Sequence, residues 1–122
     1  MLLYDLLYEI NVLSEAVAQN RVVAAITNHT VIRIYYSGDK TIRKGYRTIE
    51  PYTVGISKKG NIILRAYQRG GETDSIVPGW KLFRLKFITR WNELNEFITE
   101  PADDFNPSGD RSMRSIIKHA KF

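Results

Sequence analysis

The alternation of apolar and polar residues in the middle of this chain predicts short β-strands. In Thr30–Tyr36, the apolar residues Ile32, Ile34 and Tyr36 share one face, and the intervening residues share the other. Further strands are expected over residues 46–56, 62–68 and 82–88. Short strands at this spacing are typical of a small antiparallel barrel rather than a parallel sheet.

Turn-forming residues separate these strands. Pro51 cannot donate a ladder hydrogen bond, so we expect it at an edge or at a bend between two short strands. The run Lys58-Lys59-Gly60-Asn61 predicts a hairpin turn. Residues 70–79 combine glycine, proline and acidic residues, which predicts a loop.

Helical spacing of apolar residues appears near the N-terminus. Over residues 2–18 it predicts an amphipathic helix, whose apolar stripe must pack on the rest of the domain or on a second copy of the chain. The second arrangement would make the protein a homodimer. A short second helix is expected over residues 21–27, ended by Asn28 or His29.

The same spacing predicts helices near the C-terminus. One is expected over residues 90–98, with Thr89 as its N-cap, and a shorter one over residues 111–120. Residues 101–110 between them predict a loop.

Composition excludes several classes of protein. A chain of 122 residues is long enough for one domain. The absence of cysteine excludes disulfides and thiolate sites, and two histidines far apart in sequence provide no metal site. We find no nucleophile–base pair and no converging carboxylates, so we expect neither an enzyme nor a cofactor. No apolar run reaches bilayer-spanning length and the N-terminus does not resemble a signal peptide, which predicts a cytoplasmic protein.

Charge is distributed unevenly along the chain. The net charge is +5, but residues 33–90 contain 13 Lys and Arg against 4 Asp and Glu, whereas the remainder contains 5 against 9. A basic middle between acidic ends indicates a positive potential on one module, and therefore an anionic partner. The alternative interpretation is the solvated face of a basic protein without a specific partner.

One predicted strand face combines arginine with tyrosine. Arg65, Tyr67 and Arg69 alternate along residues 62–68 and just beyond. Guanidinium groups bind phosphate bidentately and a tyrosine ring stacks on a base, which suits single-stranded nucleic acid. The alternative is that these are ordinary polar side chains on a solvent-exposed strand.

Four further residues extend this hypothesis. Arg84 and Lys86 lie on the outward side of their strand, where they either contact phosphate or protect a sheet edge. Arg33 and Tyr35 share the outward side of the first strand. Arg47 differs, because alternation places it with apolar neighbours. It either pairs with a carboxylate, such as that of Glu50 or Asp39, or faces a ligand at the mouth of the barrel.

Residues 22–88 resemble the WYL domain, a small Sm-like β-barrel. The segments that carry the resemblance are AAITNHTVIRIYY, RTIEPYTVG, GNIILRAYQ and WKLFRLKFI, in the family's order and spacing. Of the Trp-Tyr-Leu signature only Leu64 is retained, after Ile62 and Ile63. The family usually places this domain after a winged-helix domain, for which this chain has no room. It therefore resembles a stand-alone form, phage-encoded or accessory.

The resemblance implies binding of nucleic acid or a nucleotide-like ligand through basic residues, with Arg47, Arg65 and Arg84 at the family's motif positions. We therefore expect a single α+β domain: an N-terminal helix over residues 1–20, a WYL-like antiparallel barrel of about five strands over 21–88, and a helical extension over 89–122. The expected function is non-enzymatic binding of single-stranded DNA, RNA or an oligonucleotide in a regulatory or accessory role. The alternatives are a protein-interaction or dimerisation module, and a nucleotide sensor or sponge in phage–host defence.

Overall fold

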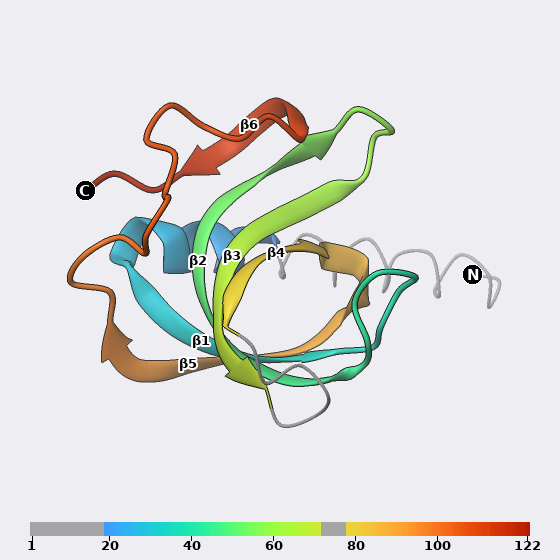
Figure 1. Ribbon diagram of the computed structural model, residues 1–122, viewed down its shortest axis with the longest axis horizontal. Coiled ribbons are helices and arrows are strands. Elements are labelled where there is room, and N and C mark those ends of the chain that lie inside the picture. Colours follow the sequence, from blue (N-terminus) through green and yellow to red (C-terminus); the bar gives the residue numbers. More distant parts are fainter. Residues whose placement is uncertain (1–18, 72–77) are drawn as a thin grey trace, which may run out of the picture.

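Six antiparallel strands form one curled sheet with a short helix beside it (Figure 1). The computed structural model describes residues 19–71 and 78–122. The strands follow the order β4-β3-β2-β1-β5, and β6 pairs with β2 outside this path. Their bounds are β1 Thr30–Tyr36, β2 Gly45–Ser57, β3 Ile62–Gly71, β4 Gly79–Arg84, β5 Ile88–Phe97 and β6 Met113–His119, with the 3₁₀ turn η1 over Leu85–Phe87.

Strand β2 holds the sheet together because it pairs with three partners. One edge pairs with β3 along most of its length, whereas the other edge pairs first with β1 and then with β6. Pro51 lies between Ile49, which pairs with β1, and Thr53, which pairs with β6. The predicted bend is confirmed as a register shift between Pro51 and Thr53, but the strand continues through it.

The helix spans residues 19–28 of the described chain, which confirms the expected helix over 21–27. Val22, Ala25 and Ile26 are buried at helical spacing and join the core. The helix ends where His29 adopts a left-handed backbone conformation, with φ of 54°. The helix expected over residues 2–18 lies outside the described residues, as does most of the loop expected over 70–79.

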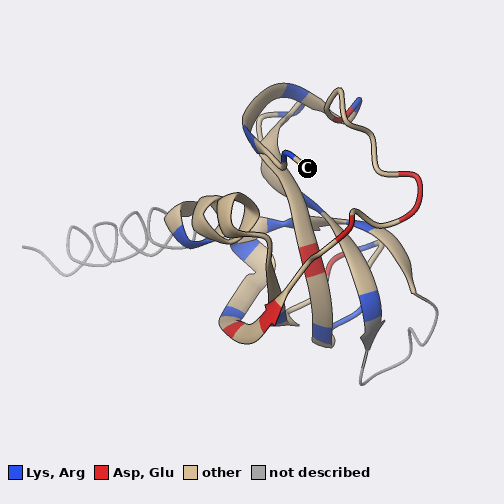
Figure 2. Ribbon diagram, turned by 90° about the vertical axis from the view of Figure 1, so that its left-hand side faces the viewer, with Lys and Arg blue, Asp and Glu red and all other residues tan. Residues whose placement is uncertain are grey.

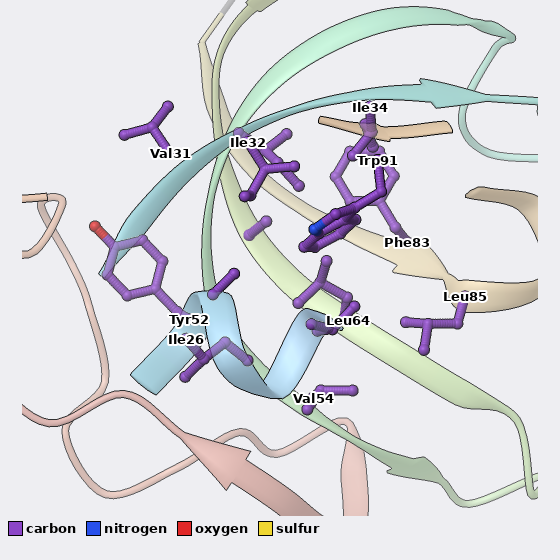
Figure 3. Packing of buried hydrophobic residues seen from close by; sticks show 14 of the residues in the cluster. Ile26, Val31, Ile32, Ile34, Tyr52, Val54, Leu64, Phe83, Leu85 and Trp91 are labelled. Carbon is purple, nitrogen blue, oxygen red and sulfur yellow. The ribbon is translucent and has the colours of Figure 1, made fainter. Parts of the chain in front are cut away.

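The core fills the concave side of the curled sheet (Figure 3). Ile32 and Ile34 of β1 are fully buried, as the alternation predicted, and they meet Leu64 of β3, Phe83 of β4 and Trp91 of β5. Each such side chain contributes about 1.5–3 kcal/mol through burial. No described helix combines the length and hydrophobicity needed to cross a bilayer.

The two C-terminal helices predicted over residues 90–98 and 111–120 are wrong, because both segments are strands. β5 pairs with the free edge of β1, where Trp91 lies opposite Ile34 and is buried against the core. Thr89 caps no helix, and its hydroxyl donates to the carbonyl of Tyr35. The apolar residues of 90–98 do recur at helical spacing. The segment forms a strand nevertheless, because its pairing with the free edge of β1 outweighs this local preference.

Antiparallel pairing is confirmed, whereas closure into a barrel is not. The hairpin at residues 58–61 joins β2 to β3, as expected. β4 begins at Gly79, before the expected start at residue 82, and ends at Arg84. The sheet is an open path whose end strands β4 and β5 are joined through η1 without pairing with each other. The fold is therefore an α+β arrangement dominated by one curled sheet.

Gly55 allows β6 to approach β2. A Cβ atom on this residue would lie 2.4 Å from the carbonyl oxygen of Ser115 and 2.7 Å from the sulfur of Met113. We predict that Gly55→Ala lowers the free energy of unfolding by about 1–3 kcal/mol, because β6 must shift away from backbone that cannot yield. The matched control is Gly79→Ala, whose Cβ would meet no atom within 4 Å. Equal urea midpoints for the two variants would contradict this account of β6 docking.

Candidate functional site

Three neighbouring strands place arginine and tyrosine side chains together on the outer side of the sheet. Tyr35 on β1 lies opposite Tyr46 on β2 and opposite Arg90 on β5. Directly opposed residues of antiparallel strands project to the same face, and alternation places Arg33 on it too. We call Arg33, Tyr35, Tyr46 and Arg90 the arginine–tyrosine face.

Ring contacts organise this face. The guanidinium carbon of Arg33 lies 4.5 Å from the ring centre of Tyr46, and the rings of Tyr35 and Tyr46 meet edge to face at 4.9 Å. Arg33 and both tyrosines are half-buried, and Arg90 is exposed. Flat groups and cations are thus held side by side at the surface, an arrangement able to stack bases and contact phosphates.

Arg65, by contrast, lies on the outer side of β3 but is paired with an internal acid. Its Nε donates to Asp110 at 2.7 Å, and its Nη2 donates to the Ser112 hydroxyl at 3.2 Å. Burial raises the pKa of Asp110, but hydrogen bonds from Arg65 and from the Ser112 backbone outweigh it, so the pKa lies below its ordinary value. Two nitrogens of this guanidinium are therefore already engaged, and Asp110 offsets its charge.

Arg69 is also paired with carboxylates. Its Nε donates to Glu50 at 2.7 Å and its Nη1 donates to Glu96 at 2.5 Å. Glu50 is buried and also accepts a hydrogen bond from the Tyr52 hydroxyl. Arg69 therefore joins β3 to β2 and β5. Figure 2 shows that acidic and basic positions are interspersed along the described part of the ribbon, because acids from the C-terminal part fold back onto the basic middle.

Tyr67 is half-buried against Trp80 of β4. The two rings meet edge to face, 5.5 Å apart, and the indole N–H of Trp80 donates to the carbonyl of Asp103. The expected Arg65–Tyr67–Arg69 row is therefore present on one side of β3, but its three side chains already contact other parts of the protein.

Arg84 lies on the same side of the sheet as Arg65, because Arg84 pairs with Ile63 and Leu82 pairs with Arg65. The two outward rows thus merge, as expected from pairing of these strands. Arg84 lines a cavity of about 620 Å³ together with Lys59, Lys81, Asn61 and Asp39.

The Arg84 guanidinium is held at the edge of this cavity. Its Nη2 donates to Asn61 at 2.9 Å, and its buried Nε has no acceptor among residues 19–71 and 78–122. The ring of Phe87 lies 5.1 Å from the Arg84 guanidinium and 5.0 Å from the ammonium of Lys86. Lys86 is in η1 rather than in the strand that the sequence predicted.

Arg47 is buried, with 2% of its surface exposed, on the apolar side that alternation predicted. It donates to the side-chain oxygen of Gln68 at 2.7 Å and to the carbonyl of Arg43 at 2.6 Å. The carboxylate of Asp39 is engaged by Tyr36 and by the following turn. A ligand-facing role for Arg47 stays a prediction.

Sequence reasoning missed Tyr46 and Arg90. Arg90 was placed at the start of a helix, so its alignment with Tyr35 across a strand pair was not visible. The segment around Arg90 carries no apolar–polar alternation that would indicate a strand, because Thr89, Asn92 and Glu93 beside Trp91 are all polar. Within the described residues, no three His, Asp or Glu side chains gather in a way that would hold a metal ion.

Comparison with known proteins gives one informative result. No family model matches this chain, and no curated protein matches it. Among solved structures, it is similar to the proteasome accessory factor B/C of Arthrobacter aurescens, with a TM-score of 0.58 and 30% sequence identity. The similarity covers 75% of this chain but 13% of that much longer chain. It supports the WYL-like fold expected from the sequence, whereas membership of the WYL family stays a prediction.

The carboxylate of Asp39, which lines the Arg84 cavity, makes the stability of the fold depend on pH in the acidic range. Burial raises its pKa, but hydrogen bonds from the Tyr36 hydroxyl and from the backbone of Ile42 and Thr41 outweigh burial and lower the pKa to about 2. A depressed folded-state pKa stabilises the fold above the unfolded-state value near 3.9, and this stabilisation is lost as pH falls toward 2. We predict that the stability difference between wild type and Asp39→Asn, measured by urea unfolding, is constant above pH 5 and shrinks below pH 4.

The control for this prediction is Asp104→Asn, since Asp104 is exposed and its carboxylate has no hydrogen-bond partner in the described part of the chain. A difference between wild type and Asp39→Asn that persists unchanged at low pH would contradict the role of the charged carboxylate.

Proposed function

We propose that this chain is a non-enzymatic, WYL-like regulatory domain that binds single-stranded nucleic acid on the arginine–tyrosine face. The observation that supports this most strongly is the register of β2, β1 and β5, which places Tyr46, Tyr35 and Arg90 in one row. A regulatory role draws support from the similarity to the proteasome accessory factor B/C, although the matched part is a small share of that protein.

A single strand suits this face better than a duplex. Tyrosine rings stack on bases only where the bases are unstacked, as they are in single-stranded nucleic acid. Arginines on either side of the rings would contact the phosphates that flank each stacked base. Every base offers a π face to a tyrosine ring, so the binding is expected to tolerate changes of sequence.

The acid-paired arginines have a different role in this proposal. Arg65 and Arg69 hold the C-terminal part of the chain and β5 to the sheet, through Asp110 and Glu96. Moving either arginine to a phosphate would leave a largely buried carboxylate, Asp110 for Arg65 and Glu50 for Arg69, without its partner. We therefore assign phosphate contacts first to the exposed Arg90, with Arg33 held over the ring of Tyr46.

A second candidate function rests on the cavity that contains Arg84. Its lining joins three cations, Lys59, Lys81 and Arg84, with hydroxyl and amide groups, around one carboxylate that is already hydrogen-bonded. A volume of about 620 Å³ lies within the range of sites for small ligands, roughly 300–1,000 Å³. A nucleotide bound there through its phosphates would make the protein a sensor.

We predict that Arg90→Ala weakens binding to single-stranded DNA and lowers the magnitude of the log–log salt slope by about 0.7 for each phosphate that the variant no longer neutralises. Tyr35→Leu should weaken binding by about 1–3 kcal/mol with an unchanged salt slope, because it removes stacking rather than charge. Both quantities come from fluorescence-anisotropy titrations at several salt concentrations.

The matched control is Arg114→Ala, which removes the same charge from an exposed position on β6. If Arg114→Ala and Arg90→Ala have the same effect, net charge rather than the arginine–tyrosine face carries the binding.

Calorimetry distinguishes the second candidate. A mononucleotide that binds wild type, but binds Lys59→Ala at least about fivefold more weakly, would favour the sensor. Binding of short oligonucleotides without any mononucleotide binding would favour the arginine–tyrosine face.

A further inference from the structure

Residues 99–112, which we call the C-terminal strap, cross the outer side of β3 and β4. Three contacts hold the strap to the sheet: the backbone N–H of Ala102 donates to the Tyr52 hydroxyl, Trp80 donates to the carbonyl of Asp103, and Arg65 pairs with Asp110. The strap is therefore held near its beginning, by two adjacent residues, and near its end. All of it lies outside the span of the WYL resemblance.

A cavity of about 270 Å³ lies between the strap and the sheet. Tyr52 of β2 is fully buried at its base. Trp80 from β4 and Phe105 from the strap each contact the Tyr52 ring, with centroids 5.0 Å and 5.1 Å away. Tyr52, Trp80 and Phe105 all line the cavity, so its walls are largely aromatic.

The rim of this cavity offers hydrogen-bonding groups of both kinds. The carboxylate of Asp104 and the guanidinium of Arg111 have no hydrogen bond or ion pair within the described residues. The side-chain oxygen of Asn106 accepts from the backbone of Ser108, which leaves its amide N–H groups available. An acceptor and two donors thus surround an aromatic space.

We propose that this cavity binds one nucleobase, edge-on to the rim and with its ring against Trp80. A nucleobase matches the site because it combines a flat π face with donors and acceptors on one edge. A purely apolar ligand would leave the rim groups unmatched, and a simple anion would meet Asp104 and Asp110. A volume below the roughly 300 Å³ of small-ligand sites fits one ring system rather than a whole oligonucleotide.

This inference deepens the proposed function, since the base is taken to belong to the bound single strand. A single-stranded nucleic acid lying on the sheet would turn one base into the cavity, and that base would fix the register of the nucleic acid on the protein. The arginine–tyrosine face would supply most of the affinity through phosphate contacts and stacking, and the cavity would add one enclosed base contact that Trp80 reports.

Trp80 provides a direct test. The chain has two tryptophans, and Trp91 is buried in the core. Fluorescence of the 122-residue chain is titrated with an oligonucleotide of about ten nucleotides, with an abasic oligonucleotide of equal charge, and with adenosine alone. We expect quenching by the first and by adenosine, none by the abasic strand, and loss of quenching in Trp80→Phe.

Two surface variants keep the test independent of folding. Arg111→Ala and Asn106→Ala should weaken binding of the base-containing strand by about fivefold and leave binding of the abasic strand unchanged. Arg114→Ala, an exposed cation on β6, is the matched control and should affect both strands equally.

The outcomes separate this inference from the proposed function. Tighter binding of the base-containing strand without quenching of Trp80 would overturn the base site and leave the proposed function standing. Quenching by adenosine without binding of any strand would support the base site and overturn the proposed function. Absence of quenching by every ligand would overturn the base site.

Discussion

Strand β2 is the element on which the rest of this structure depends. Its thirteen residues connect β3 on one edge with both β1 and β6 on the other. The change of partner falls at Pro51, where a missing N–H matters least. Because β1 carries β5 and β3 carries β4, a shift of β2 by one residue would displace every surface described above. The arginine–tyrosine face and the strap cavity are both consequences of this single register.

Charge pairing gives the fold its second constraint. The sequence separates basic and acidic residues into different stretches, but folding brings them together. Asp110 reaches Arg65 across 45 positions, and Glu96 reaches Arg69 across 27. A partly buried carboxylate paired with arginine keeps its charge, which ties the two stretches together. Local charge along a sequence therefore overstates the positive potential that remains at the surface.

The middle of the fold could be read from the sequence because its signals are local. Alternation in β1, the turn at residues 58–61 and the bend at Pro51 each depend on neighbouring residues, and the structure confirms them, although β2 continues through Pro51 as one strand. β5 and β6 could not be read this way. Trp91, Leu94 and Ile98 fit helical spacing, and only the free edge of β1 makes a strand the better solution.

The site was predictable to the same extent. Arg33, Tyr35, Arg65 and Tyr67 lie on outward faces, as alternation indicates. Their partners Tyr46, Arg90 and Asp110 depend on which strands become neighbours, and a single sequence does not contain that information. The burial of Arg47 followed from its apolar neighbours, but its contact with Gln68 depends on the pairing of β2 with β3.

The crossing of residues 99–112 over the sheet has a consequence for the boundaries of the folding unit. The recognisable pattern ends near residue 88, yet β1 finds its second neighbour only after that point, and Arg65 finds its acid later still. A fragment that ends near residue 88 would expose the edge of β1. It would also leave Trp80 without its contact to the strap and the Arg65 guanidinium without Asp110. Such a fragment would tend to self-associate. The segment that can be recognised and the segment that can fold are different lengths of the same chain.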